Sequence, residues 1–211
     1  MNIKYLLLFL FLLTMRGISF CQVGSSSNLY EINRLIEESL TPLENNLIIL
    51  GKDKLYLLTD ESRSIPGAYI TKIIKTKFSG YRILVNSGNA DYTDSADYLI
   101  NIKRPSIKTL YKKIYDEDIQ GMKKVEREIK VAYDLSLTER KSLFDVFRNN
   151  FSKKSKDSFN IEERNLIEDR NFDFSRSELP EENAMNQIVY PALIILSTAA
   201  AIILFFTIRS N

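Results

Sequence analysis

Three aspartates spaced three residues apart, Asp91, Asp94 and Asp97, are the side chains whose pattern best suits metal chemistry. On a helical turn they would lie on one side, and carboxylate oxygens suit a hard cation such as Ca²⁺. The segment lacks the alternate-residue ligand spacing and the central glycine of an EF-hand loop. A polar loop in which one aspartate caps a turn is the simpler interpretation, so we expect no metal site here.

Other candidate catalytic groups are weaker. Asp116, Glu117 and Asp118 form a second acidic group, which is typical of the solvated tip of a hairpin. Ser62 and Ser64 have no lysine at the spacing of a Ser-x-x-Lys enzyme, so we expect them to cap local structure. A carboxylate pair for hydrolysis remains open, because any two acids of the chain can meet in space.

The composition removes most other catalytic chemistry. The 211 residues include no histidine and no tryptophan, and they include one cysteine, Cys21. The chain therefore has no Ser-His or Cys-His nucleophile system, no imidazole metal ligand and no intrachain disulfide. We predict no catalytic residue, no cofactor-binding residue and no metal ligand, and we expect that the protein is not an enzyme.

Basic residues gather in a long hairpin that the sequence predicts after residue 96. They are Lys103, Arg104, Lys108, Lys112, Lys113, Lys123 and Lys124. On a shared face they would form a basic patch suited to an anionic partner, such as lipid head groups or a wall polymer. The preferred interpretation is the wet face of an exposed hairpin, where lysines discourage pairing between sheet edges.

The elements that must position these groups are clearest in the second half of the chain. Between residues 125 and 137 apolar and polar residues alternate, with Arg127 as the exception on the apolar side. This period of two predicts a strand with one wet face. The segments 96–118 and 141–154 predict two more strands, the first with its register broken near Pro105. Short polar turns join the three strands, so we expect an antiparallel meander.

The first half predicts helices and shorter strands. Apolar residues at helical spacing predict helices over 27–40 and 64–78. The two apolar runs on either side of residues 51–54 predict a hairpin, and 81–87 predicts a short strand. This order indicates an α+β domain with helices packed against a mixed sheet.

Both ends of the chain carry hydrophobic segments. Residues 1–21 combine Lys4, a short apolar run and small polar residues, which is the pattern of a secretory signal peptide. Cys21 is either at the end of the cleaved signal or a lipidated first residue. The segment 188–208 has no charge and would extend about 31 Å as a helix, against a bilayer core of about 30 Å. It predicts a transmembrane helix, with Arg209 on the cytoplasmic side.

The expected fold class is α+β, a mixed sheet with a long antiparallel meander and flanking helices, plus one C-terminal transmembrane helix. The predicted segments are a signal peptide (1–21), a linker (22–28), an exported α+β domain (29–160), a short helix and acidic stalk (161–187), a transmembrane helix (188–208) and a cytoplasmic tail (209–211). The exported part is nearly neutral, which gives no electrostatic case for nucleic acid as a partner.

The order of elements resembles a known group of proteins. The stretches "NLIILGKDKLYLLT", "SIPGAYITKIIKTKF", "YRILVNS", "ADYLINIKR" and "VEREIKVAYDLSLTERKSLFDVF" resemble the periplasmic α/β domain of bacterial envelope accessory lipoproteins. That group includes the curli-secretion channel protein and the penicillin-binding-protein activator. The resemblance covers residues 29–160 and lies in the pattern of elements. It implies a non-catalytic scaffold or regulatory module, and it carries over no functional residue.

We therefore expect a single-pass membrane protein of the bacterial envelope, with its N-terminal domain periplasmic or outside and its C-terminus cytoplasmic. Its predicted role is non-enzymatic binding or scaffolding. The alternatives are an oligomeric, secretion-channel-like or lipid-modified envelope subunit and, more distantly, a carboxylate-based envelope hydrolase. The expected partners are membrane lipid through Ile188–Ile208 and an envelope protein, without nucleic acid. The small residues Ser197 and Ala201 also permit weak self-association.

Overall fold

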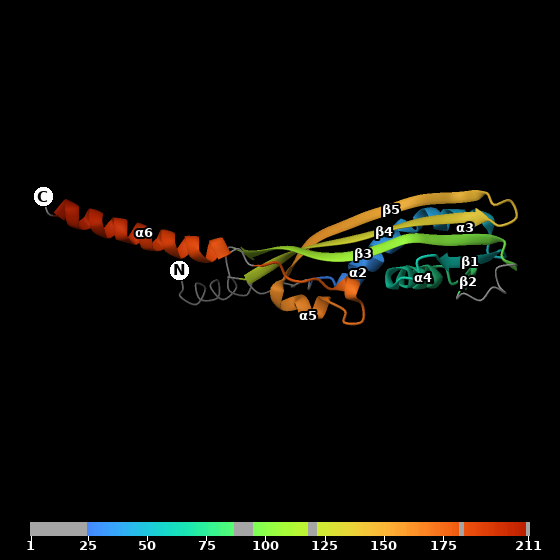
Figure 1. The fold of residues 1–211 in the computed structure, drawn as a ribbon, viewed down its shortest axis with the longest axis horizontal. Coiled ribbons are helices and arrows are strands. Elements are labelled where there is room, and N and C mark those ends of the chain that lie inside the picture. The colour runs from blue at the N-terminus through green and yellow to red at the C-terminus, as the bar shows by residue number, and fades with distance from the viewer. Residues whose placement is uncertain (1–24, 87–94, 118–121, 182–183, 210–211) are drawn as a thin grey trace, which may run out of the picture.

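A computed structural model describes residues 25–86, 95–117, 122–181 and 184–209. In these residues five strands form one mixed sheet in the order β2-β1-β3-β4-β5, with helices packed on one of its faces (Figure 1). The strands are β1 (Leu55–Asp60), β2 (Arg82–Val85), β3 (Tyr98–Glu117), β4 (Met122–Glu139) and β5 (Asp145–Asn160). β1 runs parallel to both β2 and β3, whereas β3, β4 and β5 are antiparallel neighbours. The predicted mixed sheet with a long meander is confirmed.

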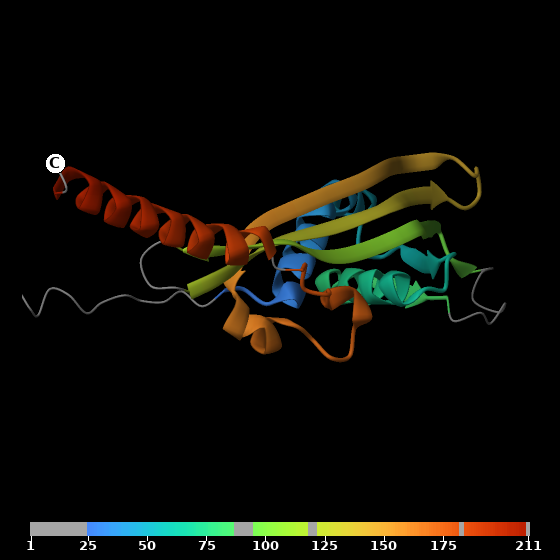
Figure 2. The same ribbon diagram turned by 60° about the vertical axis from the view of Figure 1, so that its left-hand side comes forward.

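The alternation along β4 divides the sheet into an inner and an outer face. The apolar residues of β4 point inward and are buried, namely Val125, Ile129, Val131, Tyr133, Leu135 and Leu137. Apart from Val125, which belongs to a smaller cluster, they share one core with residues of the helices. The polar residues of β4 form part of the outer face, which no helix of the described residues covers in either view (Figures 1 and 2).

Three helices cover the inner face. They are α2 (Asn28–Ser39), α3 (Thr41–Leu50) and α4 (Ile65–Lys77). The Ser64 hydroxyl accepts a hydrogen bond from the Gly67 N–H at 3.2 Å, which caps α4 as its sequence predicts. Ser62 donates to Asp60 at 2.7 Å in the same turn, so both serines support local structure.

The hairpin predicted around residues 51–54 is wrong, because the first of its two apolar runs belongs to α3. Pro42 lies in the first turn of this helix, where a missing N–H costs little, so it begins a helix rather than ending one. Leu43 and Leu47 are four residues apart and both are fully buried. Gly51, with a φ of 96°, ends the helix by donating its N–H to the Leu47 carbonyl at 3.0 Å.

The predicted break in β3 is confirmed. The pairing register between β3 and β4 shifts between Lys103 and Ser106, on either side of Pro105. Arg104 has a positive φ of 49° at this point. Proline has no N–H to donate to the ladder, so a bulge here removes the need for that bond.

The segment after β5 folds back onto the domain, although its acidic sequence suggests an irregular stalk. It contains two short 3₁₀ helices, η2 (Ile161–Glu163) and η3 (Asp173–Ser175), and the short helix α5 (Arg164–Ile167). The rings of Phe172 and Phe174 lie edge-on to Tyr69 of α4, with centroids 4.9 and 5.2 Å away. Thr109 of β3 donates to the Phe174 carbonyl at 2.9 Å. These two phenylalanines therefore hold the segment against the core.

The last helix, α6 (Ala184–Arg209), projects away from the sheet (Figure 2). In the part of the chain that the structure describes, no helix is both long enough and apolar enough to cross a bilayer. The transmembrane helix predicted at 188–208 is therefore wrong, as is the single-pass membrane localisation that depended on it. The predicted signal peptide and Cys21 lie outside the described residues.

Candidate functional site

The structure describes three of the six acidic residues singled out in the sequence, and these three do not come together as a site. Asp97 accepts a hydrogen bond from the Leu55 N–H at 2.9 Å, so it ties the start of β1 to the start of β3. Asp116 lies in β3 opposite Lys123. Glu117 ends the same strand, while Asp91, Asp94 and Asp118 lie outside the described residues. Among the described residues, no three cysteine or carboxylate side chains are grouped as metal ligands.

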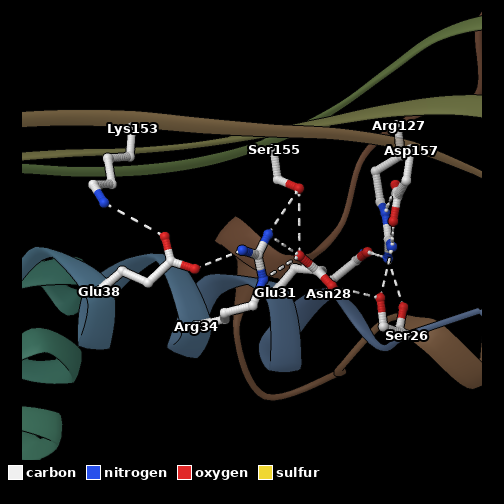
Figure 3. Close-up of polar contacts among 9 residues, drawn as sticks. All are labelled: Ser26, Asn28, Glu31, Arg34, Glu38, Arg127, Lys153, Ser155 and Asp157. Carbon is white, nitrogen blue, oxygen red and sulfur yellow. Dashed lines mark hydrogen bonds and ion pairs between the residues drawn. The ribbon is translucent and has the colours of Figure 1, made fainter.

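A polar seam joins α2 to the inner face of β4 and β5 (Figure 3). At one end, Arg127 is fully buried and forms an ion pair with Asp157, which lies directly opposite on β5. The Arg127 Nε donates to Asp157 Oδ1 at 2.7 Å. Its Nη1 donates to the Asn28 Oδ1 at 2.6 Å and to the Ser26 carbonyl at 2.8 Å. The exception in the β4 alternation thus faces inward with its charge satisfied.

The seam continues along α2. Arg34 donates to Glu31 at 2.8 Å and to Glu38 at 2.6 Å, and it also reaches the Ser155 hydroxyl of β5 at 3.2 Å. Lys153 of β5 lies 3.4 Å from Glu38.

Burial opposes ionisation of Glu31, but hydrogen bonds from Arg34, Ser26 and Ser155 outweigh it and lower the pKa of Glu31 below its ordinary value. Glu31 is therefore ionised at neutral pH and does not suit general-acid chemistry. The seam fixes α2 on the sheet.

The outer face carries a different arrangement of charge. Lys108 of β3 lies opposite Lys130 of β4, and Lys130 lies opposite Lys154 of β5. Neighbouring strands are about 4.8 Å apart, so the three lysines form one row across the sheet. All three are exposed. Like charges directly opposite each other destabilise a sheet, so the cross-strand pairs within this lysine row do not themselves stabilise the fold.

One carboxylate, Glu128, stands next to the lysine row. Its oxygens lie 2.7 Å from Lys112 Nζ, 2.9 Å from Lys130 Nζ and 3.6 Å from Lys156 Nζ. The lysine chains cover Glu128 and leave its side chain 3% exposed. Hydrogen bonds from Lys112 and then Lys130 lower the pKa of Glu128 to about 2. Three lysines therefore share one glutamate, and with Lys108 and Lys154 beside Lys130 this group of five lysines and Glu128 has a net positive charge.

The structure divides the basic hairpin residues that the sequence groups together. Lys103 pairs with Glu61 at 2.9 Å, and the Arg104 Nε donates to Asp134 at 2.7 Å, so these two charges are neutralised. Lys113 lies opposite Glu126, and Lys123 and Lys124 lie at the start of β4. Of the seven basic residues in the predicted set, only Lys108 and Lys112 belong to the group formed by the lysine row and the lysines that contact Glu128.

A polar hollow adjoins the neutralised pairs on the sheet. It has a volume of about 830 Å³ and is open to solvent. Its polar lining includes Glu61, Asn101, Lys103, Arg104, Asp134, Ser136, Arg148 and Asn150. A hollow of this size and polarity suits a hydrophilic side chain or chain segment better than an apolar small molecule.

Sequence reasoning missed Lys130, Lys154, Lys156 and Glu128 as members of one cluster. The alternation along β4 was a sufficient signal to put Glu128 and Lys130 on the wet face. The missing information was the pairing register between strands, which depends on turn lengths and bulges.

The lowered pKa of Glu128 predicts a specific acid sensitivity. Its folded-state pKa lies below the ordinary value of 4.5, so the unfolded chain binds this proton more readily. The stabilisation is therefore present above about pH 4.5 and is lost as the pH falls toward 2. Urea unfolding of the wild type and of Glu128→Gln, measured at steps across this window, should converge as the pH falls. A constant difference between the two proteins at all these pH values would contradict the contacts around Glu128.

Comparisons with known proteins found similarity to solved structures but to no family model and no curated protein. No family model matches the chain, and no curated protein matches it. A neuraminyllactose-binding hemagglutinin homolog from Helicobacter pylori is 16% identical at a TM-score of 0.32, covering 50% of this chain and 67% of its own. A minor lipoprotein from Acinetobacter baumannii is 9% identical at a TM-score of 0.28, covering 51% of this chain and 66% of its own. Both of these proteins are bacterial and the second is a lipoprotein, and at these TM-scores neither similarity assigns a function to this chain.

Proposed function

We propose that the domain is a non-enzymatic binding module of the bacterial cell envelope, and that the outer face of β3, β4 and β5 is its binding surface. The observation that carries this proposal is the lysine row formed by Lys108, Lys130 and Lys154 on an exposed sheet face. The signal-like sequence of residues 1–21 supports the envelope setting.

Folding alone does not account for the lysine row. Opposite charges in cross-strand pairs stabilise a sheet by about 0.2–1 kcal/mol, and like charges destabilise it by a similar amount. The neighbouring Arg104–Asp134 pair lies on the same face and shows the stabilising arrangement. An anionic partner would remove the repulsion within the row, so its binding is linked to the stability of the sheet.

The non-enzymatic role rests on the chemistry of the charged groups. The chain contains no histidine. The carboxylates of Glu31 and Glu128 have lowered pKa values and are held by cations, so neither is suited to transfer protons near neutral pH. The lysine row lies on an open strand surface and not in an enclosed, water-excluded pocket of the kind in which catalysis gains strength.

Site-specific crosslinking in living cells tests the proposed surface. A photo-crosslinking amino acid replaces Ser152, on the outer face of β5, or Lys54, in the exposed loop before β1. We expect a discrete crosslinked product from position 152 and none from position 54. Equal products from both positions, or a product from position 54 alone, would show that the outer face is not the binding surface.

A further inference from the structure

We propose that the partner is an acidic, extended segment of another protein, which adds to the sheet as a strand alongside β5. This inference rests on the proposed function and specifies the partner of the same surface. It combines two independent features of β5, namely its open edge and the lysines that lie beside that edge.

The first feature is the length of the open edge. β5 is the last strand in the sheet order and pairs only with β4 among the described strands. It has 16 residues, whereas β2 at the opposite edge has 4. A long edge of this kind offers backbone donors and acceptors to an added strand.

The second feature is the charge at this edge. Lys154 ends the lysine row, and Lys156 follows two residues later on the same outer face. Alternate residues of a strand are about 6.8 Å apart along one face. Acidic residues at alternate positions of an added strand would therefore stand opposite Lys154 and Lys156 as cross-strand ion pairs. The inner-face residue Asp157 is already paired with Arg127, and Lys156 shares the single carboxylate of Glu128 with Lys112 and Lys130, so the net charge on the outer face of this stretch is positive.

The same charges argue against the other occupants of this edge. A second copy of β5 paired about this stretch would set lysines against lysines, which destabilises the pairing. A non-protein polyanion would contact the lysine row but would make no use of the backbone edge. An acidic strand is the occupant that satisfies both features.

The test uses the full chain and a synthetic peptide of alternating glutamate and valine, with binding followed by fluorescence anisotropy. We expect Lys154→Glu and Lys156→Glu each to weaken binding by about tenfold, because an attractive cross-strand pair becomes repulsive. Lys54→Glu is the matched control, with the same charge change in the exposed loop before β1, and should weaken binding by less than about threefold because salt screens distant charges. A backbone N-methylated peptide, which cannot donate ladder hydrogen bonds, should not bind.

The following results would overturn the inference. Equal binding of the N-methylated peptide, or equal effects of Lys54→Glu and Lys154→Glu, would show that the edge is not used. Binding of inorganic polyphosphate but not of the peptide would reject the acidic strand and leave the outer face as the binding surface. Dimerisation of the wild-type chain that is lost in Lys154→Pro would assign the edge to a second copy. An absence of peptide binding together with an absence of crosslinks from position 152 would reject the proposed function as well.

Discussion

Replacing Asp157 with alanine is expected to destabilise the domain by about 3–5 kcal/mol, the range for breaking a buried ion pair from one side. The change leaves the Arg127 guanidinium fully buried with neutral partners only, namely Asn28 and Ser26. An uncompensated buried charge is among the most costly features of a folded protein. Because domains are stable by only about 5–15 kcal/mol, the loss would remove a large share of the total.

Replacing the other partner of the ion pair, with Arg127→Met, should destabilise the domain less. It leaves Asp157, whose side chain is 36% exposed and can be hydrated in place of its lost partner. The remaining cost comes mainly from the buried Asn28 Oδ1, which loses its donor at about 1–3 kcal/mol, whereas Ser26 is only half-buried and its carbonyl can be hydrated. The double substitution should resemble Arg127→Met and be more stable than Asp157→Ala.

Chemical denaturation of the two single variants and the double variant measures these differences. The order of stability is expected to be wild type, then Arg127→Met and the double variant, then Asp157→Ala. If Asp157→Ala proves as stable as Arg127→Met, the Arg127 guanidinium must be hydrated in the variant, and the claim that it is buried away from water would be contradicted.

Placing aspartate at position 131 is expected to unfold the domain. Val131 is 2% exposed, on the inner face of β4 between Ile107 of β3 and Lys153 of β5. The substitution removes apolar burial of about 1.5–3 kcal/mol and buries a carboxylate whose opposite neighbour, Lys153, already lies 3.4 Å from Glu38, so the combined loss approaches the stability of an ordinary domain. Loss of the cooperative melting transition in circular dichroism would show this result.

The matched control is the neighbouring position on the other face. Lys130→Asp places a carboxylate between Lys108 and Lys154, where it replaces two repulsive cross-strand pairs with attractive ones. It also removes one cation from Glu128, which opposes the gain. We therefore expect a melting temperature close to that of the wild type. Equal damage from Val131→Asp and Lys130→Asp would mean that the inner and outer faces of β4 are assigned incorrectly.

The sequence was most informative where one pattern determined one property. The alternation over residues 125–137 predicted β4 and its inward side, because a strand buried on one face must alternate. The break near Pro105 and the cap at Ser64 were also predicted, because each depends on the backbone chemistry of a single residue. The run 46–50 was assigned wrongly because a short apolar run fits a strand or a helix equally well.

The candidate site could not be predicted in the same way, because its members come from three strands. Lys108, Lys130 and Lys154 are separated by more than twenty residues at each step, and only the pairing register makes them neighbours. The β3–β4 register shifts twice, so the paired residues cannot be found by counting back equally from the turn along both strands. The pairing of Arg127 with Asp157 also depends on the strand register. From the sequence alone, Arg127 was therefore only a charged exception among the apolar positions of β4.

Charge reversal of the lysine row tests the central claim most directly. The measurement is the yield of the crosslinked product from position 152 in full-length protein carrying Lys130→Glu and Lys154→Glu, compared with protein carrying Lys54→Glu. We expect the paired reversal to abolish the product while the melting temperature stays near that of the wild type, and Lys54→Glu to leave the product unchanged. An undiminished product from the folded, charge-reversed protein would contradict the account, because binding would then not depend on the lysine row.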